Sequence, residues 1–458
     1  MLGSEVAGSD EAREGAAAVR SLFARAAGDY MSVDLWLAFA EYVAREQGTY
    51  LNSAGDDGAD AAATTVGHIR DVFEEAVGAV GWHPVDTRVW DAFLAYERTR
   101  LTAAMKSGDA DAVATQKERM VGLWTRRMAV PVLTIQAVWD ACTAWHAEVG
   151  LEPDAAMEEL AAATTTASTA LVAHEQTLAN AQYDAAAYNA YTAADGLRPG
   201  TRRMIFERAV TEHCLSAELW RDYAQWMDAN ANPEAAVQVW ARGTRNCPWY
   251  GDLWVGYLAG LASDAATDAE TIDAVAGKAL AALNRVDKFD GVAAAVLAFH
   301  RRRVSDWNDE TQIAAWRQVF PDLRQAAADR FGKDAGKLGA APHVLVARVE
   351  SELVRDYDQA RKAWGYTLRA APDRSDLWWS WIAFESMVGS ADQVRAVFAK
   401  ALEAGVDKAA FAGAWRSFEA ARGSVEEARR AEATIRPVIA AVEQAKAARK
   451  AKRTPIRG

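Results

Sequence analysis

The chain has 458 residues, of which 51% are hydrophobic and 25% are charged, and its formal net charge is −12. This balance argues against a protein whose whole surface binds polyanions such as nucleic acid. Three widely separated cysteines without a Cys-x-x-Cys pair exclude a disulfide framework or a thiolate zinc site as the organising feature, and they fit a reducing compartment. No secretory signal or transmembrane segment is visible, so we expect no membrane association.

Apolar residues recur at steps of three and four, which is the period of an α-helix. The chain is rich in Ala, Leu, Glu and Arg, and strand signals are nearly absent. Its 18 tryptophans are many for this length and must be buried somewhere. These patterns predict an all-α fold.

An aromatic phrase recurs along the chain. In most copies a Trp follows an apolar residue, and another aromatic residue stands three or six positions later. At 100° per residue these positions span about 120° of a helix, so the phrase predicts one broad buried stripe. In chain order the Trp copies begin at Trp36, Trp90, Trp139, Trp220, Trp254 and Trp378. Tyr188 and Ala412 stand at this position in weaker copies.

A second phrase, Arg-x-x-Phe or Arg-x-x-Trp, accompanies the first, in most copies with Ala three positions later. The small Ala permits close approach of a paired helix. We expect the Arg, and the Glu that often ends the first phrase, to bond across helices or at helix ends. The copies begin at Arg20, Arg70, Arg203, Arg361 and Arg395.

The phrases repeat with a period of 34 residues, for example from Trp220 to Trp254. Two helices in 34 residues form the unit of tetratricopeptide-like solenoids, in which neighbouring units bury each other's aromatic faces. Trp36 and Trp90 lie further apart, and we place the excess in a Gly/Asp/Ala-rich loop insertion at 48–66. The predicted repeat core contains Trp36, Trp90, Trp220, Tyr223, Trp254, Tyr257, Trp378 and Trp381.

Two segments between the phrases carry further expectations. The Ala/Thr-rich stretch 161–173 interrupts the repeats and is predicted to be a long connecting helix. At the joint between two repeats, Cys247 is interpreted as a small packed residue and Trp249 as a packed joint residue. Asp252 is predicted to cap the next helix.

No catalytic constellation, cofactor site or metal site is recognisable, so we expect a protein that is not an enzyme. None of the seven histidines forms a His-x-x-x-His pair for a helical zinc site. His213 adjoins Cys214, but neighbouring helical side chains point about 100° apart and do not by themselves form a nucleophile–base pair. The segment 332–337 resembles a phosphate-binding loop but has the wrong glycine spacing, and Leu338 stands where Ser or Thr is needed.

Side chains outside the repeat pattern are candidates for contacts with partners. Trp379 lies beside the stripe, and Trp415 is followed by Arg416, so all three are candidate partner or dimer contacts. Packing at the edge of the core is the alternative for Trp379. The run 301–303 of three arginines can hold an acidic partner or a phosphate backbone, or it can cap a helix C-terminus.

The last residues of the sequence are basic. Residues 446–458 contain six Lys or Arg and no acid. Such a run is typical of a nuclear-localisation signal or a nucleic-acid patch, and a solvated helix end is the plain alternative. The candidate residues are Lys446, Arg449, Lys450, Lys452 and Arg453.

A helix with Trp-x-x-Tyr and a later Glu, paired with an Arg-x-x-Phe-x-Arg-Ala helix and a Pro, resembles the half-a-tetratricopeptide (HAT) repeat of RNA-processing scaffolds. The resemblance covers residues 19–430. More narrowly, segments 22–36, 206–220 and 242–254 are similar to the family of the squamous cell carcinoma antigen recognised by T cells, the U4/U6 snRNP recycling factors.

This resemblance implies a HAT-repeat (TPR-like) α-solenoid, a non-enzymatic scaffold in the nucleus that serves pre-mRNA splicing through U4/U6 snRNP assembly and recycling. It implies an N-terminal sub-array over 1–260, a dimerising C-terminal sub-array over 265–435 and a basic localisation tail over 436–458. It also implies protein partners in the U4/U6 snRNP, a deubiquitinase and histones. The family's RNA-recognition motifs have no counterpart in these residues, so we expect RNA contact to be indirect.

Two alternatives stay open. The same fold can serve another RNA-processing complex, either the U1 snRNP or the mRNA 3′-end cleavage machinery, although the Asn-Cys-Pro-Trp run at 246–249 favours the U4/U6 family. The second alternative is direct RNA binding through the basic tail and the arginines at 301–303. A strong dependence of RNA affinity on salt would favour it.

Overall fold

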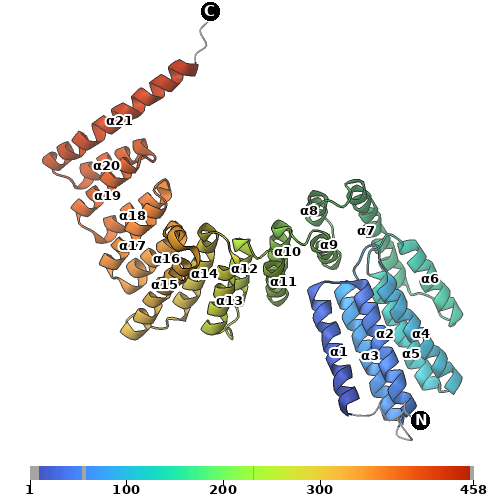
Figure 1. Ribbon diagram of the computed structural model, residues 1–458. Coiled ribbons are helices and arrows are strands. Elements are labelled where there is room, and N and C mark those ends of the chain that lie inside the picture. Colours follow the sequence, from blue (N-terminus) through green and yellow to red (C-terminus); the bar gives the residue numbers. More distant parts are fainter. Residues whose placement is uncertain (1–9, 54–57, 231, 454–458) are drawn as a thin grey trace, which may run out of the picture. The chain divides into compact units, whose positions relative to one another are not determined.

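The computed structural model describes residues 10–53, 58–230 and 232–453; within these ranges, the side chains of 10–13, 46–53, 58–67, 336–337 and 446–453 lie outside the description. The secondary structure of the described residues is entirely helical (Figure 1). The chain divides into two compact units, Met1–Trp226 and Met227–Gly458, and the division falls within helix α10.

The first unit holds the helices before the division. They are α1 (Asp10–Asp29), α2 (Val33–Ser53), α3 (Gly58–Val80), α4 (Arg88–Ser107), α5 (Ala110–Met128), α6 (Ile135–Glu148), α7 (Ala155–Asn180), α8 (Ala185–Ala193), α9 (Pro199–Glu212) and most of α10 (Ala217–Ala229). The long α7 contains the whole Ala/Thr-rich stretch 161–173, as predicted.

The second unit contains α11 (Pro233–Asn246), α12 (Gly251–Leu261), α13 (Ala269–Ala282), α14 (Val286–Arg303), α15 (Glu310–Phe331), α16 (Ala340–Val349), α17 (Tyr357–Ala370), α18 (Ser375–Val388), α19 (Ala391–Ala404), α20 (Lys408–Arg422) and α21 (Val425–Arg453). A 3₁₀ helix, η2 (Gly332–Lys337), follows α15, and a π-helix, η3 (Glu350–Val354), follows α16.

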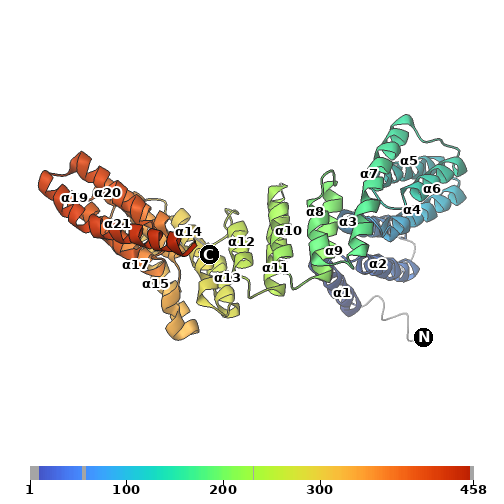
Figure 2. The ribbon, with the colours of Figure 1, turned by 90° about the horizontal axis from the view of Figure 1, so that it is seen from above.

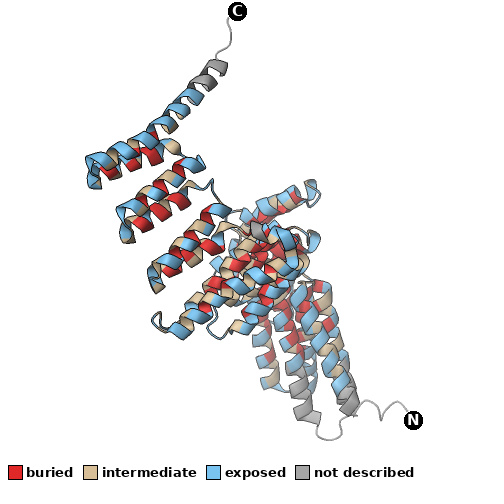
Figure 3. Ribbon diagram, turned by 60° about the vertical axis from the view of Figure 1, so that its left-hand side comes forward, coloured by how far each residue is buried: buried red, intermediate tan, exposed pale blue. Residues whose placement is uncertain are grey.

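In several places within each unit a helix packs on the next helix and also on the one after that. Thus α2 contacts both α3 and α4, α12 contacts both α13 and α14, and α19 contacts both α20 and α21. Figure 2 shows these layers from above, and Figure 3 shows the buried residues on the faces that successive helices turn toward each other. The predicted α-solenoid of helix pairs is confirmed.

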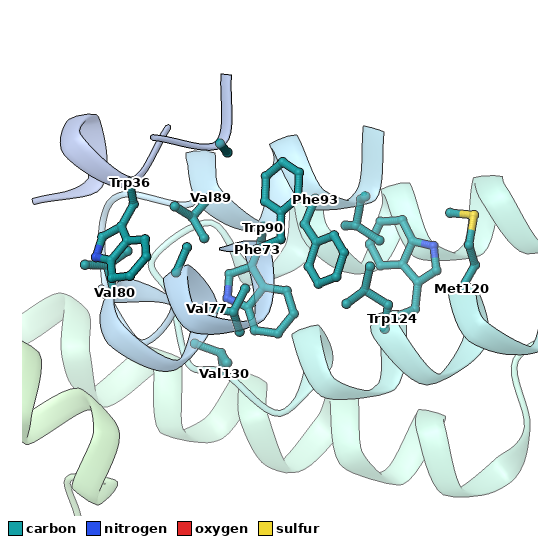
Figure 4. Close-up of a cluster of buried hydrophobic side chains, with 14 of the residues drawn as sticks. Trp36, Phe73, Val77, Val80, Val89, Trp90, Phe93, Met120, Trp124 and Val130 are labelled. Carbon is teal, nitrogen blue, oxygen red and sulfur yellow. The ribbon is translucent and has the colours of Figure 1, made fainter. Parts of the chain in front are cut away.

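The aromatic phrases account for the buried layers. Seven of the eight predicted core residues are less than 9% exposed, and the eighth, Tyr257, is half-buried. The Phe of the second phrase stacks on the aromatic residue of the following helix; Figure 4 shows Phe73 and Phe93 in this layer. Three such stacks have the same centroid separation of 5.0 Å: Phe23–Phe39, Phe73–Phe93 and Phe206–Tyr223.

The first Trp of a repeat also fixes the joint that precedes it. The indole N–H of Trp220 donates to the carbonyl of Cys214 at 2.8 Å, and that of Trp254 donates to the carbonyl of Pro248 at 2.9 Å. Trp378 repeats the bond at 3.0 Å to Pro372. In each case the acceptor lies six residues earlier, so the indole satisfies a carbonyl beyond the end of the previous helix.

At three places the arginine of a second phrase forms a buried Arg–Glu pair that links consecutive helices; Arg317, outside the phrases, forms a similar set with Glu350 and Asp356. Each pair is bidentate, and the carboxylate belongs to a Glu that is at most 3% exposed. The guanidinium then reaches a polar side chain in a third helix, so we call each set an arginine node. The three nodes are Arg70–Glu97–Gln116, Arg361–Glu385–Gln393 and Arg395–Glu419–Glu427.

In two nodes the third member also caps the start of its own helix. Gln393 accepts from the backbone N–H of Ser390, while its own N–H donates to the Ser390 hydroxyl, which forms a capping box. Ser424 and Glu427 make the same pair of bonds at the start of α21. The glycine before each serine is required, because a Cβ on Gly389 or Gly423 would collide with the buried carboxylate of its node.

Three local expectations are wrong. Most of the predicted loop at 48–66 is helical, since α2 runs to Ser53 and α3 begins at Gly58; the Ala-rich start of α3 favours a helix. Asp252 lies in the first turn of α12, whose N-cap is Tyr250. Trp249 is 43% exposed rather than packed in the joint, whereas Cys247 is buried there.

The two compact units divide at Trp226, and α12 packs on α11 as well as on α13 and α14. The expected sub-arrays over 1–260 and 265–435 stay a prediction.

Replacing Trp254 with Ala removes both a buried ring and the bond across the joint. We expect the free energy of unfolding to fall by about 3–5 kcal/mol. Trp249→Ala, five residues earlier but exposed, is the matched control and should melt within a degree or two of the wild type. Thermal melting followed by circular dichroism measures both. Equal melting of the two variants would remove the core role of Trp254.

The node at Glu419 makes stability depend on pH. The hydrogen bonds from Arg395 hold the pKa of Glu419 below its ordinary value. The ionised carboxylate therefore adds its full contribution to the free energy of unfolding above the unfolded pKa of about 4.3. This contribution is lost as the pH falls through the lower folded pKa. Glu419→Gln should lower the free energy of unfolding by about 1.5–3 kcal/mol at pH 7. This deficit relative to the wild type should shrink below pH 4.

Urea unfolding of the wild type and Glu419→Gln at a series of pH values measures the deficit. Glu426→Gln is the matched control, because Glu426 is 75% exposed in its pair with Arg430. A deficit for Glu419→Gln that stays constant from pH 7 to pH 3 would contradict the assignment.

Candidate functional site

Reactive side chains do not assemble into a catalytic centre in the described residues. Cys142 and His146 face each other on α6, with Sγ 3.6 Å from Nδ1, a pair that was not predicted from the sequence. Burial raises the pKa of the Cys142 thiol to about 12, so it is not a nucleophile at neutral pH. His213, the neighbour of Cys214 in the sequence, forms a hydrogen bond through Nε2 with the carbonyl of Tyr183 at 2.7 Å.

A metal site, a phosphate-binding loop and a membrane-spanning helix are also not formed by the described residues. Across the described ranges, no group of three or more His, Cys, Asp and Glu is placed to hold a metal ion. No described helix is both long enough and apolar enough to cross a bilayer. The loop-like segment 332–337 forms η2, which continues directly from the end of α15 rather than from a strand, and Leu338 after it is buried.

The predicted contact residues have different environments. Trp415 is 5% exposed, stacks on Phe398 and donates its indole N–H to Glu419 at 2.9 Å. It is a core residue, because it stands three positions after Ala412 and thus within the aromatic stripe; its proposed surface role is wrong. Trp379 is half-buried and stacks on Phe411, with centroids 4.3 Å apart.

The charged candidates lie at helix ends and on the surface. Arg416 is exposed and forms a bidentate pair with Glu432. The three arginines at 301–303 form the last turn of α14, and Arg303 donates to the carbonyl of Thr267 at 3.2 Å. Lys446, Arg449, Lys450, Lys452 and Arg453 belong to the last turns of α21, and their side chains lie outside the described residues.

The second unit has a groove along α17, which we call the α17 groove. It consists of two cavities of about 420 and 430 Å³ that share Lys362 and Tyr366. The first cavity is lined by α14, α15, α16 and α17, and the second by α17, α18 and α19. Figure 1 shows these helices in succession. The groove could not be predicted from the sequence, because its exposed cations, Arg324, Lys362, Arg369 and Lys400, are not part of the repeat phrases.

Tyr366 lies at the centre of the α17 groove and is 46% exposed. The guanidinium of Arg369 lies 4.4 Å from its ring centroid, and that of Arg324 lies 6.0 Å away. The buried imidazole of His343 stacks on the ring, with centroids 5.7 Å apart. Burial, together with Arg324 and Arg369, lowers the pKa of His343 to about 4, so it adds no charge at neutral pH.

The groove carries a local surplus of positive charge. Arg324, Lys362, Arg369 and Lys400 are exposed, and none forms an ion pair with a carboxylate among the described side chains. The two glutamates that line the groove already form ion pairs with other arginines: Glu350 with Arg317, and Glu385 with Arg361. The arrangement can hold a negatively charged ligand, but it presents no group for chemistry on it.

Comparison with known proteins points to one kind of relative. No protein-family model matches the chain. It is 26% identical to a mouse protein described as spliceosome associated factor 3, U4/U6 recycling protein, over 360 residues, which are 76% of this chain and 34% of the relative. The human protein of the same description is 26% identical over 359 residues, with the same two coverages. The zebrafish protein is 26% identical over 334 residues, 69% of this chain and 35% of the relative.

The chain thus spans about a third of the length of the curated relatives that it matches. Among solved structures, a crystal structure of CstF-77 is 16% identical, with a TM-score of 0.44, and covers 96% of this chain and 86% of the other. The structure of Naa15/Naa10 bound to HypK-THB is 10% identical, with a TM-score of 0.26, covering 93% of this chain and 77% of the other. Neither score is high enough to add to the description of the fold.

Proposed function

We propose that this chain is a non-enzymatic repeat scaffold that takes part in pre-mRNA splicing by assembling or recycling the U4/U6 snRNP. One observation carries the proposal: the similarity to U4/U6 recycling proteins of mouse, human and zebrafish extends over 69% to 76% of the chain. The fold agrees with it, since stacked helix pairs expose long surfaces for partner proteins.

The proposal includes partners and a compartment. Proteins of the U4/U6 snRNP are the first partners, with a deubiquitinase and histones as further ones, and RNA is contacted through these proteins. The scaffold acts in the nucleus, and the basic residues at the end of α21 supply the localisation signal. The negative net charge supports the indirect route to RNA, because the chain as a whole repels a polyanion.

We also propose that the second unit forms a homodimer. Its surface exposes apolar side chains that a second copy can cover, among them Met387 at 84% and Val425 at 71% exposed. These two side chains are our candidate contacts between the copies. The N-terminal and C-terminal sub-arrays would then serve different contacts.

Affinity purification of the tagged full chain from cells that express it tests the splicing role. We expect U4 and U6 RNA and their proteins to be enriched over U1 RNA in the same eluate. The chain lacking 446–458 is the matched variant; added to a nuclear extract, which removes any need for import, it should retain the same RNAs. Enrichment of U1 RNA or of 3′-end cleavage factors would contradict the proposal.

The same comparison tests direct RNA binding. If the purified full chain alone binds U6 RNA with a strong salt dependence and the shortened chain does not, the scaffold mechanism is wrong.

Light scattering coupled to gel filtration tests the dimer. At micromolar concentration we expect twice the mass of one chain. Met387→Glu should reduce the dimer fraction, because it places a charge in the apolar contact. Leu215→Glu is the matched control, as Leu215 is 66% exposed in the first unit. A wild-type chain that elutes as a monomer would remove the dimer from the proposal.

A further inference from the structure

The α17 groove combines two features that point to one kind of ligand. Its rim is basic, with four cationic side chains at Arg324, Lys362, Arg369 and Lys400 that lack a described carboxylate partner. Leaving like charges close together costs free energy, so such a cluster is stabilised when an anionic group binds. The arginines of the three nodes, by contrast, are each paired with a buried carboxylate.

The second feature is the apolar lining of the first cavity. Trp316, Phe320, Pro321 and Val346 contribute to its wall. Its one carboxylate, Glu350, accepts two bonds from Arg317, at 2.8 and 2.6 Å, and presents no free charge. A cavity of about 420 Å³ with such a lining accommodates a large apolar side chain.

The backbone beside this cavity is irregular. At Glu350 the helix widens from α16 into the π-helix η3, and Arg355, which follows η3 as its C-cap, has a positive φ of 63°. Single π-turns are frequent at functional sites. Here the wider turn accompanies the bonds from Arg317 to Glu350 and to Asp356, the N-cap of α17. Arg317 thus connects η3 with the start of the helix that carries Lys362 and Tyr366.

We propose that the α17 groove binds a short acidic peptide segment of a partner protein. One apolar side chain of the peptide enters the first cavity, and its carboxylates pair with Arg324, Lys362 and Arg369. Lys400 on α19, which lies 5.3 Å from the ring of Trp381, pairs with a further carboxylate of the peptide. This proposal goes beyond the splicing role and does not depend on it, because it concerns the chemistry of one bound segment.

The groove favours a peptide over single-stranded RNA. The basic cluster is confined to the neighbourhood of α17, whereas RNA needs a continuous basic track and stacking aromatics along several nucleotides. The ring of Tyr366 already stacks on His343 and lies 4.4 Å from the guanidinium of Arg369, so a stacking base would compete with these contacts. A chain with a net charge of −12 also repels a long polyanion outside the groove.

Fluorescence anisotropy on the purified full chain tests the proposal. The probe is a short labelled peptide with a central Phe flanked by Glu and Asp. We expect saturable binding that weakens as salt is raised, and about tenfold weaker binding when Ser replaces the Phe. A peptide with Lys in place of the acids should not bind. A labelled oligouridine RNA should bind more weakly than the acidic peptide.

Variants of the chain assign the binding to the groove. Lys362→Glu and Arg369→Glu each reverse one exposed charge and should weaken binding of the acidic peptide about tenfold or more. Arg302→Glu is the matched control, since Arg302 is exposed in the same unit but outside the groove. Melting curves that coincide with the wild type show that the variants are folded. Wild-type affinity in both groove variants, no binding at all, or preferential binding of the RNA would each overturn the proposal.

Discussion

The buried Arg–Glu pair is the interaction on which the rest of this repeat structure depends. Its carboxylate lies in the interior, where an unpaired charge would cost several kcal/mol, so the guanidinium must be held in place. Because the arginine, the glutamate and the third polar group come from three consecutive helices, satisfying one charge fixes the relative position of all three. Apolar stacking supplies most of the buried area but does not specify register in this way.

Much of the fold could be predicted from the sequence, because the aromatic phrases carry a strong helical period. The sequence also predicted that the second-phrase arginines bond across helices. It did not predict which glutamate each arginine pairs with, since the spacing from Arg70 to Glu97 is 27 residues and that from Arg361 to Glu385 is 24. The loop predicted around 48–66 failed because its glycines and aspartates resembled turn signals, whereas its alanines favour a helix.

The candidate site was less accessible to sequence reasoning. Tyr366, Arg369 and Lys362 lie on the exposed side of α17, where the repeat pattern places no demand, and Arg324 comes from a different helix. Only the packing of α15 to α19 brings them together. Trp415 shows the opposite error: beside an arginine it suggested a surface contact, but its distance from the degenerate first position places it in the stripe.

The glycine–serine step after a node glutamate has a consequence for identifying repeats. Glycine makes room for the carboxylate, serine begins the next helix, and the residue three positions later closes both the cap and the node. The resulting string, Glu-x-x-x-Gly-Ser-x-x-Gln or Glu, occurs at Glu385 and again at Glu419. The second copy survives where Ala412 has replaced the first tryptophan. In divergent solenoids of this type, repeat register can therefore be read from a polar signature after the aromatic one has faded.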